Sequence, residues 1–299
     1  MAVAIPTPAF SRRSLLIGAA GLAVTAACSK KKVDINVDPS TGSQSLSLGV
    51  PSFVMLANTD QRVGLVLAGP DGAIAPTGPV QVAFAPNGSK GPGQFDAFVT
   101  PEVHTDAGSV PAYLTVVHRF PSPGVWWVQA RYGGKAAIAA LQIDDTTTSS
   151  VPAPGQPMVR LATPTTADHR GVEPICTRTP ACPWHDVSLD AALDEHRPMA
   201  VLFATPRLCK SATCGPVLDT LLSLKSQFEA KIRFVHLEIY TDGSGTNPNP
   251  PNTAAVKAYN LPGEPFLFLA GADGKVVDRI DGLYGTSEVQ GKLAKLAGT

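Results

Sequence analysis

A proline-, serine- and threonine-rich segment, residues 145–170, divides this chain into two parts with different hydrophobic patterns. Such a composition offers few apolar side chains to pack and fixes φ at many positions, which is typical of linkers. Strand-like runs alone precede the segment, whereas strand-like and helix-like runs alternate after it. The 299 residues are enough for about two ordinary domains. We therefore expect domains at residues 46–144 and 171–299, joined by a linker.

The first domain is predicted to be an all-β, immunoglobulin-like sandwich. Strands close together in sequence and separated by Gly, Pro, Asp and Asn clusters favour a β-sandwich of about 100 residues. The predicted strands are 52–57, 61–68, 80–85, 112–118, 125–131 and 136–143. FPSPGVWWVQA, which starts at Phe120, resembles the late strands of bacterial immunoglobulin-like domains, and this implies a tryptophan packed into the core. His104 and His118 are isolated, so we expect a spacer or protein-binding module without chemistry of its own.

The second domain is predicted to be an α/β sandwich with a mixed sheet. Continuous apolar runs have the length of buried strands, and the last two flank a glycine-containing turn as a hairpin. The predicted strands are 199–204, 232–240, 266–270 and 275–280. The predicted helices are 189–195, 216–230, 253–259 and 287–296.

Residues 1–27 have the features of a processed export signal. Arg12-Arg13 precedes an apolar stretch of thirteen residues, which as a helix rises only about 20 Å, too short for a hydrocarbon core of about 30 Å. SRRSLL resembles a twin-arginine signal, which implies export of a folded protein, and VTAAC resembles a lipobox with Thr25 at an atypical position. The lipobox implies lipid attachment at Cys28. We expect a bacterial lipoprotein, exported, anchored to the outer face of the cell membrane and followed by a polar tether over residues 28–45.

The charge balance argues against nucleic acid as a partner. The chain has 24 basic and 24 acidic residues, whereas phosphate binding needs a concentrated basic surface. The basic run Lys30–Lys32 directly follows the export signal. It is expected to be a solvated flank, or to be weakly attracted to anionic lipid headgroups.

Export also determines how the remaining cysteines are interpreted. In an extracytoplasmic protein they are expected to form disulfides. Four cysteines allow three pairings, and their spacing favours the two local ones, Cys209–Cys214 and Cys176–Cys182. The second pair is expected to staple a small loop. The alternative is a second redox pair that exchanges electrons with the first.

Three segments of the second domain together resemble the thioredoxin superfamily. FATPRLCKSATCGPVLD resembles the strand–cysteine–helix entry, GEPF at 263–266 the cis-proline turn, and DGKVVDRIDGLYGTSEVQGKL the final hairpin and helix. The resemblance covers roughly residues 184–298. It implies a thioredoxin-like domain in which a cis Pro265 faces the cysteine pair. It also implies that the backbone of Glu264 binds an incoming substrate chain by strand-like pairing.

The position of Cys209 explains what the pair can do. A cysteine between a buried strand and a helix start faces unpaired N–H groups and the positive end of the helix dipole. Both favour the thiolate, which is the attacking species. Cα atoms five residues apart in a regular helix are roughly 8–9 Å apart, too far for a disulfide, which needs about 7 Å or less. Either Cys209 lies in the loop before the helix and curls back, or the helix begins irregularly.

Four residues separate Cys209 from Cys214, where the family usually has two. With Pro216 as the register mark, Cys209 falls one residue from the family's nucleophile position and Cys214 lies past the resolving position. Two functions are therefore consistent with the sequence. The first is a thiol–disulfide oxidoreductase without cofactor that acts on exported cysteine-containing proteins or with a membrane redox partner. The second is a non-catalytic lipoprotein with structural disulfides that binds or scaffolds a partner.

Copper binding and peroxidase chemistry are weaker alternatives. Some thioredoxin-like proteins bind copper through two cysteines and a downstream histidine, but His236 is the last histidine of this chain. Two cysteines with His185 or His236 is the remaining arrangement. Peroxidases of the superfamily place a threonine three residues before their cysteine, whereas Thr205 lies four before Cys209. No metal site is therefore expected.

Overall fold

Short strands joined by turns form the first part of the described chain. The structure is a computed structural model that describes residues 46–147 and 149–298, so the export signal, Cys28 and the tether lie outside it. The strands are β1 (Ser47–Gly49), β2 (Met55–Leu56), β3 (Asp60–Gly69), β4 (Gly72–Ala73), β5 (Gln81–Gly88), β6 (Gly91–Pro92), β7 (Glu102–His104), β8 (Tyr113–Arg119), β9 (Gly124–Tyr132) and β10 (Lys135–Asp144). All six predicted strands are present, although the first is shortened to β2. The short strands β1, β4, β6 and β7 were not predicted.

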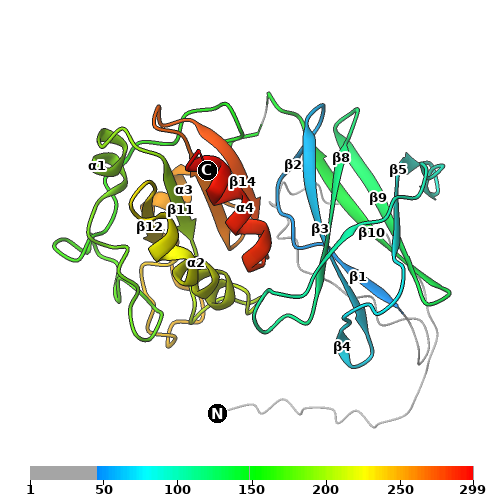
Figure 1. The fold of residues 1–299 in the computed structure, drawn as a ribbon, viewed down its shortest axis with the longest axis horizontal. Helices are drawn as coiled ribbons and strands as arrows, with labels where there is room; N and C mark the ends of the chain where they lie inside the picture. Colours follow the sequence, from blue (N-terminus) through cyan, green and yellow to red (C-terminus); the bar gives the residue numbers. More distant parts are fainter. Residues whose placement is uncertain (1–45, 148, 299) are drawn as a thin grey trace, which may run out of the picture. The chain divides into compact units, whose positions relative to one another are not determined.

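These strands form two sheets (Figure 1). One has the order β1-β3-β8-β7 with β4 beside β3, and the other has the order β2-β10-β9-β5-β6. Leu65 of β3 and Val128 of β9 belong to the same buried core, so the sheets pack face to face as the predicted sandwich. Trp126 follows the Pro-Gly turn, is only 7% exposed and contacts the ring of Phe120 edge-on. The expected core tryptophan is thus confirmed.

The second part of the chain is an α/β domain with one four-stranded sheet. Its elements are α1 (Leu189–Asp194), β11 (Met199–Phe203), α2 (Cys214–Phe228), β12 (Arg233–Leu237), α3 (Ala254–Ala258), β13 (Phe266–Ala270), β14 (Val276–Asp281) and α4 (Thr286–Leu296). The strand order is β12-β11-β13-β14, in which β11 is parallel to β12 and antiparallel to β13. The predicted mixed sheet is therefore confirmed. Within the described residues, no helix is long and apolar enough to cross a membrane.

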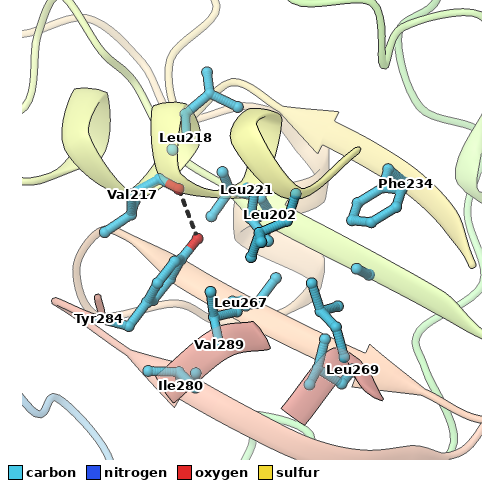
Figure 2. Packing of buried hydrophobic residues seen from close by; sticks show 14 of the residues in the cluster. Leu202, Val217, Leu218, Leu221, Phe234, Leu267, Leu269, Ile280, Tyr284 and Val289 are labelled. Carbon is cyan, nitrogen blue, oxygen red and sulfur yellow. Dashed lines mark hydrogen bonds between the residues drawn. The ribbon is translucent and has the colours of Figure 1, made fainter. Parts of the chain in front are cut away.

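All five residues of β11 are buried because both faces of the sheet are covered. Leu202 points to one face, where it shares a core with Leu221 of α2 and Val289 of α4 (Figure 2). Tyr284 closes this layer by donating a hydrogen bond to the carbonyl oxygen of Val217, at 3.0 Å (Figure 2). Neighbouring Val201 faces the other core, which also holds apolar residues of α1 and α3. This alternation explains why the strand is a continuous apolar run.

Residues 145–170 are not the loosely packed linker that their composition suggested. Val151 and Met158 are buried in the core of the α/β domain. The N–H of Met158 donates to the oxygen of Gly274 at 2.9 Å, and the N–H of Val276 donates to the oxygen of Gln156 at 2.9 Å. A few apolar side chains placed between prolines are enough to anchor the segment along β14. The correction is that this stretch is part of the second domain's packing.

Hydrogen bonds connect the sandwich to the start of α4 within one compact unit. Arg62 of β3 forms an ion pair with Glu288, which also accepts a hydrogen bond from the Tyr113 hydroxyl at 2.8 Å. The carboxylate of Asp106 accepts from the N–H of Ser287 at 2.6 Å. The same hydroxyl of Tyr113 accepts from the N–H of Gly285 at 2.7 Å. An acidic group and several acceptors thus face the N–H groups at the start of α4, where negative charge is stabilising.

We predict that Glu288→Gln destabilises the protein by about 3 kcal/mol at pH 7, because it leaves Arg62 buried without a counter-charge. Burial alone raises the pKa of Glu288, but the hydrogen bonds and charge of Arg62 outweigh it, so the pKa lies below 4.5. The stabilisation from the Arg62–Glu288 pair is then full at pH values above about 4.5, the pKa of Glu288 in the unfolded chain. It is lost as the pH falls through the lower pKa of Glu288 in the folded protein. Urea unfolding at pH 7 and in acid measures both effects. Glu229→Gln, which breaks the more exposed pair with Lys225, should cost at most about 1 kcal/mol.

Candidate functional site

Cys209 lies in the loop between β11 and α2, and this loop curls back toward the helix. The N–H of Cys209 donates to the oxygen of Thr205 at 3.0 Å, and the oxygen of Cys209 accepts from the N–H of Ala212 at 3.2 Å. Ala212 has φ of 56°, in the left-handed region, which reverses the chain direction. Of the two arrangements that the sequence left open, the structure therefore has the one with Cys209 in the loop.

Cys214 is the first residue of α2 and is completely buried, whereas Cys209 is half-buried. The N–H of Cys214 donates to the sulfur of Cys209 at 3.3 Å. The hydroxyl of Ser211 lies 3.2 Å from the same sulfur. The first turn of α2 contains no acidic residue. The positive end of this helix therefore acts on Cys209 without opposition from its own side chains.

The two thiols have opposite pKa shifts. The pKa of Cys209 is lowered to about 5, first by its hydrogen bond with the Cys214 thiol and then by Ser211 and the helix N–H groups, which together outweigh burial. Burial raises the pKa of Cys214 well above 9.0, and the negative charge of Cys209 raises it further. Near neutral pH the pair therefore holds one thiolate, on the accessible sulfur, and one protonated thiol behind it.

Glu264 lies close enough to Cys214 for its charge to act on that thiol, and Pro265 follows it directly. The peptide bond between them is cis, which was the isomer implied by the resemblance. The charge of Glu264 contributes to the raised pKa of Cys214, and burial together with Glu264 raises the pKa of Tyr240 to about 12. A cleft of about 350 Å³ opens here. Its lining includes Lys210, Tyr240, Glu264 and residues 248–250.

All four cysteines in the described part of the chain are free thiols in the structure. The disulfides Cys209–Cys214 and Cys176–Cys182 therefore stay predictions. Cys176 and Cys182 lie in a second, fully buried group together with His185 and His236. One ligand atom from each of these four residues lies within 4.8 Å of every other.

This four-residue group was not predicted as a whole. The sequence singled out Cys176 and Cys182 as a pair, and it offered either His185 or His236 as a partner for two cysteines. Two cysteines and a histidine within ten residues are a local signal for metal ligands, although five residues separate Cys176 from Cys182 and zinc sites usually have two to four. The fourth member comes from β12 and is recognisable only in the fold.

Comparisons with known proteins do not identify the chain. No family model matches it, and no curated protein does. Among solved structures, the filamin domain of Lin-41 is similar at 14% identity, covers 33% of this chain and 91% of its own, and has a TM-score of 0.22. A candidate lipoprotein from Bacillus anthracis has the same identity, coverage of this chain and TM-score, with 73% of its own chain covered. These scores are too low to support an argument about fold or function.

We predict that Cys209 of the reduced protein is alkylated with a half-maximal rate near pH 5, because its thiolate persists down to that pH. An ordinary cysteine reaches its half-maximal rate at about pH 8.5. Cys214 should stay unmodified in the folded protein because it is buried. Mass spectrometry after timed iodoacetamide pulses measures both sites. Cys214→Ala should move the half-point of Cys209 upward, and a half-point near 8.5 in the unaltered protein would contradict this assignment.

The left-handed residue in the loop provides a second prediction. Ala212→Gly should keep the loop and stabilise the protein by up to about 1 kcal/mol, because glycine adopts positive φ without the penalty that a Cβ imposes. Ala191→Gly in α1 is the matched control and should cost about 1 kcal/mol. Thermal unfolding of the two variants measures the contrast. If both substitutions destabilised equally, the curled loop would not be the conformation in solution.

Proposed function

We propose that this protein is an exported, membrane-anchored thiol–disulfide oxidoreductase whose thioredoxin-like domain acts on protein disulfides through Cys209 and Cys214. The observation that carries the proposal is the asymmetry of the pair. The accessible sulfur has a pKa of about 5, and the buried one is held protonated. The order of strands and helices in the α/β domain, with Cys209 after a central strand and Cys214 at the start of a helix, also supports it.

The two thiols perform separate steps. The thiolate of Cys209 attacks one sulfur of a substrate disulfide, so that a mixed disulfide forms and the other substrate sulfur leaves as a thiolate. The negative charge on Cys209 is then gone, which removes one cause of the raised pKa of Cys214. Cys214 loses its proton to the released substrate thiolate and attacks the sulfur of Cys209. The second substrate sulfur leaves as a thiolate and takes a proton from water, and the protein keeps a Cys209–Cys214 disulfide; the reverse sequence oxidises a dithiol.

The cleft beside the pair suits an extended polypeptide. Lys210 and Glu264 both line it, so a chain in it would lie beside the residue that follows Cys209 and beside the turn before Pro265. Strand-like pairing with Glu264 would hold such a chain regardless of its side chains. The partners that we propose are exported proteins with cysteines, or a membrane protein that renews the redox state of Cys209 and Cys214.

The proposed location depends on the export signal and on Cys28. SRRSLL and VTAAC are the sequence features that support twin-arginine export and lipid attachment. The tether at 28–45 and the sandwich would then separate the α/β domain from the membrane surface. In that arrangement the sandwich is a spacer, and its contacts at α4 hold the α/β domain.

A second candidate function is a non-catalytic protein that holds a partner at the membrane. It is favoured by two places where residues that precede the α/β domain pack closely against the surroundings of the cysteine pair. A Cβ on Gly108 would lie 3.2 Å from Pro216, two residues after Cys214, and a Cβ on Gly263 would lie 2.8 Å from Phe53. These contacts narrow the approach to the cysteines from that side.

One set of assays decides between the two candidates. The reduced protein should reduce a disulfide-bonded test protein with turnover, and Cys214→Ser should accumulate the mixed disulfide through Cys209. Cys209→Ser is the matched control, because it also replaces one thiol of the pair with a hydroxyl. It should neither reduce the test protein nor form the mixed disulfide. We expect the reduction potential to be less negative than about −270 mV, because a stabilised thiolate favours the reduced form. A potential below about −300 mV without turnover would reject catalysis in favour of a structural bond.

A further inference from the structure

The buried group formed by Cys176, Cys182, His185 and His236 is assembled from two places in the fold. The two cysteines belong to the loop before α1, His185 follows them closely, and His236 projects from β12. His185 Nε2 lies 3.2 Å from Cys182 Sγ and 3.3 Å from His236 Nδ1. His236 Nδ1 lies 3.3 Å from Cys182 Sγ and 3.8 Å from Cys176 Sγ. Two sulfur and two nitrogen atoms therefore converge on one point.

These separations match the edges of a metal-centred tetrahedron. Zinc binds thiolate sulfur at about 2.3 Å and imidazole nitrogen at about 2.0–2.1 Å. Tetrahedral angles then place neighbouring ligand atoms about 3.4–3.8 Å apart. Four of the six separations between the ligand atoms range from 3.2 to 3.8 Å, which is close to that spacing, and all six are within 4.8 Å.

Neighbouring backbone groups orient the ligand atoms toward the centre of the group. The Nε2 atom of His236 is 3.1 Å from the oxygen of Ala204, a group that can only accept, so Nε2 carries the hydrogen and Nδ1 presents its lone pair. This is the outer hydrogen bond that metal-bound histidines typically make. The N–H of Cys182 donates to the sulfur of Cys176 at 3.4 Å.

Charge compensation favours a divalent cation over a disulfide at this place. Two thiolates and two neutral imidazoles around a divalent cation make a neutral centre, which can be buried at low cost. A Cys176–Cys182 disulfide would leave both imidazoles buried against sulfur atoms that hardly accept hydrogen bonds. The buried carboxylate of Glu238 has its own donors, the N–H and hydroxyl of Thr177, at 2.6 and 2.9 Å. It is therefore not needed as a ligand.

We propose that Cys176, Cys182, His185 and His236 bind one Zn²⁺ ion in a closed tetrahedral site. The protein fills all four positions, so the ion has a structural role. That role extends to the loop of Cys209. Ala204, which accepts from His236, lies five residues before Cys209, and the N–H of Arg207 donates to the Thr177 hydroxyl at 3.2 Å. By holding His236 and Cys176, the ion fixes the two hydrogen bonds, to Ala204 and from Arg207, that position the loop of Cys209.

The test is the metal content of the full chain purified under reducing conditions without added chelator. Elemental mass spectrometry should find about one zinc per chain. Cys182→Ser and His236→Gln should each lower this content about tenfold or more. His104→Gln should retain the zinc, because His104 is also a buried histidine but its Nε2 faces Thr115 and Glu102 of the sandwich. Cys209→Ser should retain it as well, which separates this site from the redox pair.

A spectroscopic measurement keeps the proposal testable if the ligand variants fail to fold. Cobalt exchanged into the unaltered protein should give the visible absorption bands of a tetrahedral site with thiolate ligands. Three outcomes would overturn the assignment: a purified protein that takes up no zinc, copper in place of zinc at the same stoichiometry, or a Cys176–Cys182 disulfide in non-reducing peptide maps. Loss of turnover with the zinc retained would reject the proposed function and leave the metal site intact.

Discussion

Burial of β11 on both faces is the constraint on which the rest of the α/β domain depends. Because all of Met199–Phe203 is enclosed, the chain that leaves the carboxyl end of this strand begins at a fixed point. Ala204 accepts a hydrogen bond from His236 there, Arg207 contacts Thr177, and Cys209 follows. One buried strand therefore positions both groups of cysteines. The loop from the end of β11 to the start of α2 therefore has little conformational freedom, although it has no regular secondary structure.

Unequal burial distinguishes the two cysteines of the redox pair. Both lie near the start of α2, so both experience the helix dipole, but only Cys209 has access to solvent. Desolvation then keeps the proton on Cys214, while the N–H groups stabilise charge on Cys209. The four-residue spacing does not prevent this arrangement, because the turn at Ala212 brings the two residues together.

Much of the fold could be predicted from the sequence, because hydrophobic periodicity reports which faces are buried. The apolar run at 199–204 and the amphipathic run at 216–230 correspond closely to β11 and α2. Two features escaped prediction for physical reasons. Composition predicted a free linker at 145–170. Its few apolar residues are buried because β14 leaves an edge of the sheet open beside them, and this edge is known only from the fold. His185 and His236 are 51 residues apart, and only the register of β12 brings them together.

The packing of residues 150–160 has a consequence for how this protein behaves in crowded surroundings. β14 is the last strand of its sheet, and an open strand edge is a template for pairing with other chains. Pro157 lies opposite Lys275 there, and Gln156 accepts a hydrogen bond from Val276. The beginning of this edge is thereby capped by the chain itself, with a proline that cannot donate a hydrogen bond outward. The same segment that connects the domains thus shields the start of this edge from pairing with another chain.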